Sequence, residues 1–227
     1  MDRSPFAAAY RDFRLSKINE PEYRHLWYLL FWPGFIAQYL LVENLNPAPQ
    51  YHMIHCFLDD WIPFQEWFLL AYAAWYVMIV GMHLYTMLYD IASFRNYSRF
   101  LIISMSISTV IFLLYPSSQN LRPESFPREN LLTKIVGLLY WIDTPTNIFP
   151  SEHAVGAIAV FAAAVHTKSL RTPGRLAAIG ILAVLVSVST VFLKQHSALD
   201  VLAALAVCAV SYWIVYHNKR RREKDIC

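Results

Sequence analysis

Long apolar runs alternate with shorter polar segments along the whole chain. The apolar runs fall at positions 26–42, 67–89, 100–115, 153–166, 176–193 and 196–216. Runs of this kind are near the length that an α-helix needs to cross a hydrocarbon core of about 30 Å. The pattern therefore predicts an all-α integral membrane protein built as a six-transmembrane-helix bundle.

The connection between the third and fourth runs is the longest and spans 116–151. Within it, residues 129–142 alternate polar and apolar positions at roughly helical spacing, which is typical of a helix lying along the membrane interface. We expect such an interfacial helix in this loop. The chain then divides into a cytoplasmic N-terminal segment at 1–25, a six-helix membrane domain at 26–217 and a basic cytoplasmic tail at 218–227.

The composition supports a membrane protein. Hydrophobic residues make up 57% of the chain and charged residues 15%, whereas a soluble domain usually carries about 25% charged residues. Aromatic residues reach 15%, and Trp and Tyr favour the two membrane interfaces. Because the chain is compact and lacks long tails, we expect it in a bacterial plasma membrane, with a eukaryotic endomembrane as the alternative.

The basic residues predict how the bundle is oriented. With six spans, both termini and the second and fourth connections share one side, and these segments hold 15 of the 19 Lys and Arg residues. Cytoplasmic segments carry the excess of Lys and Arg, so both termini are predicted to be cytoplasmic. The other basic residues are Arg122, Arg128, Lys134 and Lys194. The segments around residues 122, 151 and 196 therefore fall on the extracytoplasmic face.

One segment of that face is Pro150-Ser151-Glu152-His153, which opens the fourth apolar run. Proline suits the first turn of a helix, and Ser151 can act as the helix cap. The free amides of a helix start attract anions, and His153 sits there with a proton to donate. The alternative interpretation is a capped helix that happens to carry an interfacial histidine.

A second segment opens the sixth run, where His196 and Asp200 are four residues apart and so lie on one helix face. A carboxylate bonded to one imidazole nitrogen leaves the other nitrogen as a base or nucleophile. An Asp near the start of an apolar span is costly and indicates function, although a structural polar pair at the membrane surface is the alternative. Lys194 lies two residues earlier.

These residues together predict chemistry on a phosphate ester. Arg122 alone would be an ordinary solvated residue, but with the other groups it can fork onto phosphate oxygens. Lysine and helix-start amides add positive potential. One histidine can then attack phosphorus while the other protonates the leaving oxygen.

The chain resembles the type 2 phosphatidic acid phosphatase (PAP2) superfamily of membrane lipid phosphatases. The family pattern is Lys-x6-Arg-Pro, then Pro-Ser-Gly-His, then Ser-Arg-x5-His-x3-Asp, and the resemblance covers roughly residues 60 to 215. The matching residues are Arg122-Pro123, Pro150-Ser151-Glu152-His153, and Ser189-Thr190 followed by His196 and Asp200. Lys194-Gln195-His196 and the stretch at 59–64 are similar to the branch that contains inositol phosphorylceramide synthase-like proteins.

The resemblance implies a role for each residue. His196 would be the nucleophile that becomes phosphorylated, Asp200 would orient it, and His153 would be the general acid. The phosphate would be held by Arg122, Ser151 and Lys194. The family needs no metal, and we expect no metal or other cofactor.

The chain departs from the family pattern at three positions. Tyr115 stands where the first motif has lysine, Thr190 where the third has arginine, and Glu152 where the second has glycine. Lys194, one helical turn after Thr190, is expected to replace the missing arginine. Glu152 is expected either to point away from the phosphate or to select a cationic or hydroxyl-rich head group.

We therefore expect a lipid phosphate phosphatase that hydrolyses a phosphomonoester or pyrophosphate through a phosphohistidine at the extracytoplasmic face. Its partners would be the lipid phosphate substrate and membrane lipids, with no nucleic acid. The first alternative is a lipid phosphotransferase on the same site, in which an alcohol replaces the water. The second, from another class, is a non-catalytic membrane transport or lipid-binding protein.

Overall fold

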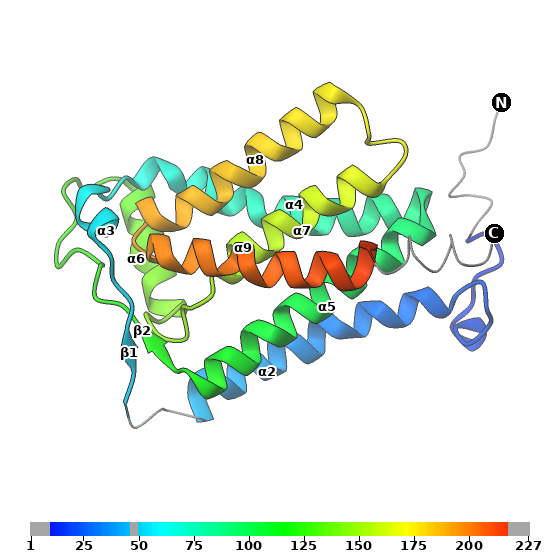
Figure 1. Cartoon of the computed structure of the whole chain (residues 1–227), viewed down its shortest axis with the longest axis horizontal. Coiled ribbons are helices and arrows are strands. Elements are labelled where there is room, and N and C mark those ends of the chain that lie inside the picture. The colour runs from blue at the N-terminus through cyan, green and yellow to red at the C-terminus, as the bar shows by residue number, and fades with distance from the viewer. Residues whose placement is uncertain (1–9, 46–49, 218–227) are drawn as a thin grey trace.

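The computed structural model describes residues 10–45 and 50–217, which form a bundle of helices (Figure 1). The long helices are α2 (Phe31–Leu45), α4 (Leu69–Tyr89), α5 (Ile91–Leu114), α7 (Glu152–His166), α8 (Pro173–Phe192) and α9 (Ala198–Tyr212). The shorter elements are η1 (Leu15–Lys17), η2 (Arg24–Leu30), β1 (His52–Met53), α3 (Phe57–Trp61), η3 (Glu66–Phe68), β2 (Ser117–Ser118), α6 (Leu131–Ile142) and η4 (Trp213–His217). The predicted tail at 218–227 and the first nine residues of the predicted N-terminal segment lie outside the described residues.

Within the described part of the chain, five segments are long and apolar enough to cross a membrane. They are Arg24–Val42, Glu66–Tyr89, Ile91–Leu114, Pro173–Phe192 and Ala198–His217. The predicted fourth span corresponds to α7, whose 15 residues fall short of the roughly 20 that a bilayer core requires. The chain is therefore a largely helical membrane protein, and the count of six spans stays a prediction.

Helix α7 occupies the centre of the bundle, where it contacts α4, α5, α8 and α9 (Figure 1). Its sequence explains this position, because it contains six alanines and one glycine. Small residues let neighbouring backbones approach closely, which is how helices associate where no water is present to drive them together. The tightest approach is at Gly156, where an added Cβ would lie 2.5 Å from Nε1 of Trp75 on α4.

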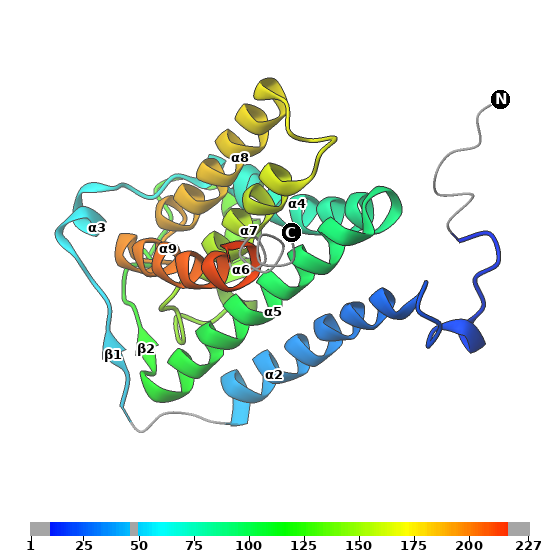
Figure 2. The same cartoon turned by 45° about the vertical axis from the view of Figure 1, so that its right-hand side comes forward.

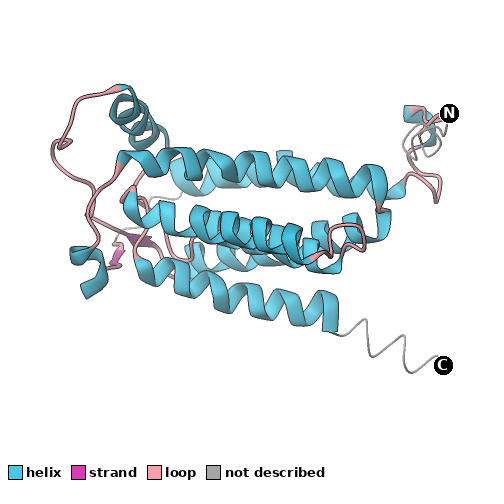
Figure 3. Cartoon of the chain, turned by 90° about the horizontal axis from the view of Figure 1, so that it is seen from above, coloured by secondary structure: helices cyan, strands magenta, loops and turns pink. Residues whose placement is uncertain are grey.

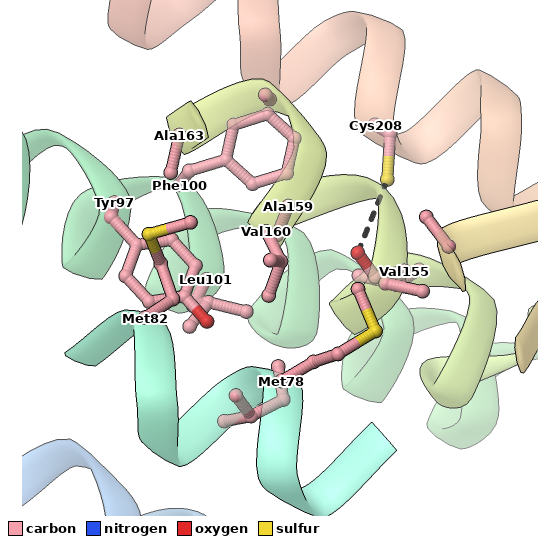
Figure 4. Close-up of a cluster of buried hydrophobic side chains, with 14 of the residues drawn as sticks. Met78, Met82, Tyr97, Phe100, Leu101, Val155, Ala159, Val160, Ala163 and Cys208 are labelled. Atoms are coloured by element: carbon pink, nitrogen blue, oxygen red, sulfur yellow. Dashed lines mark hydrogen bonds between the residues drawn. The ribbon is translucent and has the colours of Figure 1, made fainter. Parts of the chain in front are cut away.

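The apolar core lies around α7 and fixes it against its neighbours (Figure 4). The contributing side chains include Met78 and Met82 of α4, Tyr97, Phe100 and Leu101 of α5, and Val155, Ala159, Val160 and Ala163 of α7. The Cys208 thiol of α9 donates a hydrogen bond to the Val155 carbonyl at 3.8 Å. Close packing leaves α7 little freedom to slide, so the residues at its N-terminus have a defined position.

The two long connections, which carry β1, β2, α3 and α6, lie at one end of the bundle together with the α8–α9 turn (Figure 1). The α4–α5 and α7–α8 connections lie at the other end, where the described chain also begins and ends. Strands β1 and β2 form a short parallel pair, His52 opposite Ser117 and Met53 opposite Ser118. They are the only strands among the described residues, and Figure 3 shows how small they are beside the helices. Helix α6, capped by Asn130, lies at the same end as the strands, and its placement along the membrane interface stays a prediction.

Helix α2 lies at the edge of the bundle beside α5 (Figure 2). Several of its large apolar side chains are exposed, among them Leu40 and Leu41. Apolar side chains in such positions can face lipid without cost. The side of α2 that faces α4 instead contributes to a cavity that leads to the two histidines.

Candidate active site

His196 lies in the turn between α8 and α9. The turn reverses the chain at Lys194, which has φ 55°, a left-handed conformation that is strained for a residue with a side chain. His196 Nδ1 then lies 3.2 Å from Asp200 Oδ2. Because an ionised carboxylate only accepts hydrogen bonds, this contact places the proton on Nδ1 and leaves Nε2 with a free lone pair.

Asp200 is fully buried at the start of α9. Its Oδ2 also accepts a hydrogen bond from the Ser197 amide at 2.8 Å, and Ser197 caps the helix. Its Oδ1 has no partner within the described residues. The carboxylate is thus held by the backbone of its own helix, and it can in turn hold the imidazole of His196.

The second histidine reaches the same place from α7. Ser151 caps that helix by accepting a hydrogen bond from the Ala154 amide at 3.4 Å, and its own amide donates to the Asp200 carbonyl at 3.1 Å. This backbone link joins the starts of α7 and α9. The ring centroids of His153 and His196 are consequently 6.1 Å apart, so the structure brings the two predicted histidines together.

Two aromatic rings of α4 hold His153. Its ring centroid lies 4.3 Å from that of Tyr72 and 4.8 Å from that of Trp75. The Nε2 atom of His153 is buried and has no partner among the described residues, so it is free to exchange a proton with a ligand. Neither aromatic is predicted from the sequence, because its only signal, a spacing of three along a helix, is also typical of ordinary packing.

Arg122 does not line the cavity of the histidines, and its guanidinium is already well occupied. Its guanidinium donates to the carbonyls of Tyr140 at 2.9 Å and Asp143 at 2.6 Å, and to Gln195 Oε1 at 2.5 Å. It also stacks 4.4 Å from the Tyr140 ring centroid. Burial lowers the pKa of Arg122, and the negative charge of Asp143 acts in the opposite direction. Because Gln195 directly precedes His196 in the chain, this hydrogen bond links the guanidinium to the turn that carries His196.

Lys194 does not join this group. Its ammonium donates to the carbonyls of Asp59 at 2.7 Å and Ile62 at 2.5 Å. Burial lowers its pKa, and the charges of Asp59 and Asp60 partly offset that effect. Lys194 lines a separate cavity together with both of these aspartates. The structure therefore places it as a link to α3, away from the cavity of the histidines.

Asp59 is the other half of this link. Its Oδ2 accepts hydrogen bonds from Ser197 Oγ at 2.5 Å and from the Cys56 amide at 2.8 Å, and its Oδ1 accepts from the Ala198 amide at 2.9 Å. Burial by itself raises the pKa of Asp59, but these hydrogen bonds outweigh it, so the pKa is lowered. The carboxylate thus anchors the start of α9. In the sequence, only the family resemblance points to the stretch at 59–64.

The three departures from the family pattern have distinct environments. Tyr115 ends α5 and stacks on His52 with a centroid distance of 4.1 Å, so it fastens β1 and brings no charge. The Thr190 hydroxyl bonds to the Ser187 carbonyl, while its own carbonyl accepts the amides of Gln195 and His196. Glu152 lines the cavity that contains both histidines. The first two are therefore structural, and the third lies at the site.

That cavity has a volume of about 570 Å³, within the range of about 300–1,000 Å³ found for small-molecule sites. One end is polar and the other is lined by apolar side chains of α2, α4 and α5. The polar end includes Asp143, Glu152, His153, Gln195 and His196. No Lys or Arg of the described chain lines it, and no group of three His, Cys, Asp or Glu in that part could hold a metal ion.

Comparison with known proteins yielded one match. The family model of the PAP2 superfamily matches residues 97–224, more than half of the chain, and this range contains Arg122, Ser151, His153, His196 and Asp200. No curated protein and no solved structure matches the chain.

Proposed function

The chain belongs to the PAP2 superfamily, and from this premise we propose that it is a membrane-embedded phosphatase that hydrolyses a lipid phosphomonoester or pyrophosphate. The observation that carries the proposal is the 6.1 Å separation of the His153 and His196 rings at the polar end of a largely apolar cavity. A cavity with this lining suits a molecule that has a phosphate at one end and a hydrocarbon chain at the other.

In the first step, His196 Nε2 attacks phosphorus and forms an N–P bond while the ester P–O bond breaks. Asp200 keeps the Nδ1 proton in place and stabilises the positive charge that develops on the ring. The departing oxygen takes a proton from His153, which acts as the general acid. Arg122 and the amides at the start of α7, which Ser151 caps, offer positive potential to the phosphate oxygens.

In the second step, His153 takes a proton from water, and the water oxygen attacks phosphorus. The N–P bond breaks, inorganic phosphate leaves, and His196 returns to its neutral form. The proposal needs neither a metal nor another cofactor. Lys194, bonded to carbonyls of the α3 segment, supports the site by fixing the turn before His196.

The second candidate is a phosphotransferase, in which an alcohol takes the place of water in the second step. One observation favours keeping it. The two stretches that resemble the synthase-like branch are in direct contact. The Lys194 ammonium donates to the Asp59 carbonyl, and the Asp59 carboxylate accepts from Ser197. Release of inorganic phosphate without any acceptor alcohol would support the hydrolase; its absence until an alcohol is added would support the transferase.

The experiment is phosphate release from a panel of lipid phosphates by purified protein, comparing wild type with His196→Ala. Loss of the nucleophile should lower turnover by about 10⁴-fold or more. His55→Ala serves as the matched control, because His55 is an exposed histidine bonded to Asp60 and lies outside the cavity. Full turnover by His196→Ala would exclude the mechanism. A wild type that converts no lipid phosphate, with or without an acceptor alcohol, would leave a non-catalytic transport or lipid-binding role.

We also propose the orientation. The bundle would lie in a bacterial plasma membrane with both termini in the cytoplasm and the histidines at the outer face. The distribution of basic residues supports this arrangement. So does the shape of the bundle, because both ends of the described chain lie opposite the site end (Figure 1). A cysteine-accessibility test at exposed Trp141 and at exposed Ser16 would distinguish the two faces.

A further inference from the structure

Glu152 places a carboxyl group at the end of the cavity where the proposed reaction needs positive potential. It is the first residue of α7, directly before His153, and it lines the cavity. The free amides at the start of a helix favour an anion, so a phosphate bound there would lie beside Glu152. An ionised carboxylate in this position would repel the phosphate, and the protonation state of Glu152 therefore decides whether it opposes or assists binding.

The two carboxyl groups that line the cavity, Asp143 and Glu152, have different surroundings. Asp143 accepts hydrogen bonds from the Tyr39 hydroxyl at 3.0 Å and the Gln195 amide at 3.2 Å. Its charge also interacts with that of Arg122. The carboxyl group of Glu152 has no hydrogen bond or ion pair within the part of the chain that the structure describes. When two carboxyl groups share a site, one of them keeps its proton, and Asp143 is the one surrounded by groups that stabilise a negative charge.

The environment of Glu152 favours its neutral form. Burial and, secondly, the charge of Asp143 raise the pKa of Glu152 to about 8, so its carboxyl group is protonated at pH 7. A bound phosphate adds another negative charge beside it and holds the proton more firmly. A protonated carboxyl group has an O–H donor, whereas an ionised one only accepts hydrogen bonds. A residue that would repel phosphate as an anion thus binds it as an acid.

We propose that Glu152 takes part in the reaction as a neutral carboxylic acid and donates a hydrogen bond to a phosphate oxygen of the substrate. It stands where the family pattern has glycine, which offers no side-chain donor. No lysine or arginine of the described residues lines this cavity, so neutral donors carry more of the phosphate binding. Loss of the Glu152 proton turns the donor into a repelling anion. This inference rests on the proposed function and adds a phosphate-binding residue to the same site.

The test is the pH dependence of kcat/KM for a lipid phosphate in wild type, Glu152→Gln and Glu152→Ala. Glutamine keeps a neutral donor that does not ionise, so the ratio of Glu152→Gln to wild type should rise about 10-fold from pH 7 to pH 9. Alanine has no donor and should lower kcat/KM at pH 7 about 10- to 100-fold, the effect expected of a hydrogen bond to a charged group. A Glu152→Gln ratio that stays constant from pH 7 to pH 9 is the result of a merely structural role and would overturn the proposal.

The ratio isolates Glu152 from the other titratable groups of the cavity. Besides Asp143, these groups are Tyr39, Tyr72, Tyr76, His83, His153 and His196. Histidine and tyrosine ordinarily titrate at about 6.5 and about 10, and both proteins of the ratio contain the same ones. Glu124→Gln, at an exposed glutamate in the α5–α6 loop, is the matched control, and its ratio to wild type should not change with pH. In wild type, kcat should persist to higher pH than kcat/KM, because kcat reports the complex in which phosphate holds the proton on Glu152.

Failure of the proposed function would remain distinguishable. If wild type hydrolyses no lipid phosphate, infrared difference spectra at pH 7 compare it with Glu152→Gln, with and without inorganic phosphate. A carboxylic-acid band that is present only in wild type and shifts when phosphate is added would support the donor although the catalytic proposal had failed. A band that is absent at pH 7, or that saturating phosphate does not move, would overturn it. If Glu152→Gln does not fold, the band is followed in wild type alone, where it should shift with phosphate at pH 7 and disappear by pH 9; a band that does neither has the same consequence.

Discussion

At the scale of single residues, the buried Asp59 is the clearest example of a side chain that supports the site without facing the substrate. Its carboxylate accepts from Ser197 Oγ and from the amide of Ala198, so it fixes the first residues after His196. Asp59→Asn should remove part of this anchor, since an amide offers only one acceptor oxygen. We expect a loss of about 1–3 kcal/mol in the free energy of unfolding at pH 7, measured by thermal unfolding in detergent.

The direction of the Asp59 pKa shift predicts how this loss depends on pH. The folded pKa is lowered, so the stabilisation is complete above the unfolded value of about 3.9. It is lost as the pH falls through the folded pKa. The difference in Tm between wild type and Asp59→Asn should therefore shrink on acidification. Asp60→Asn is the control, because Asp60 is exposed. A difference that grows toward low pH would contradict the assignment.

At the scale of helices, the approach of α7 to α4 positions the general acid. Trp75 contacts both the His153 ring and the backbone at Gly156, where an added Cβ would lie 2.5 Å from Trp75 Nε1. Gly156→Ala should thus push the indole, and with it the imidazole. Small displacements of catalytic groups are costly, so we expect kcat for lipid phosphate hydrolysis to fall about 10- to 100-fold.

Gly81 on α4 provides the matched control, because its replacement changes helix propensity without displacing the Trp75 ring. An added Cβ at Gly81 would meet nothing within 4 Å, so Gly81→Ala should leave kcat near the wild-type value. The double variant Gly156→Ala/Trp75→Phe has a smaller ring at the contact and should recover part of the activity. Wild-type turnover in Gly156→Ala alone would show that the contact does not position His153.

The sequence predicts the helices and their starts but not the long-range contacts between them. The hydrophobic runs predict the long helices. The polar residues at two helix starts predict His153, His196 and Asp200 as site residues, because helix caps and i, i+4 pairs depend only on nearby residues. The turn that sends Lys194 to the carbonyls of Asp59 and Ile62 depends on contacts more than 130 positions apart. The rings of Tyr72 and Trp75 around His153 likewise come from a helix about 80 positions earlier. No local pattern encodes such contacts.

At the scale of the whole molecule, the apolar part of the cavity extends along the bundle between α2 and α4. On α4 it runs from Tyr72 to Leu84, a distance of about 18 Å at the rise of an α-helix. Its lining residues Ile36 and Val80 are 55% and 56% exposed, so the groove reaches the outer surface of the bundle, where a lipid chain can enter sideways. The length of this groove would then determine which lipid chain lengths fit.

Filling the groove halfway along α4 tests this arrangement. Val80→Trp adds a large ring to the lining, so kcat/KM should fall about 10-fold for a long-chain lipid phosphate and much less for a short-chain one, since only the longer chain loses apolar contact. Val77→Trp is the control, because Val77 is 74% exposed and does not line the cavity. If Val80→Trp lowers turnover of both lipids equally, the chain does not lie in this groove, and the site must receive its substrate from the α3 and α6 end of the bundle instead.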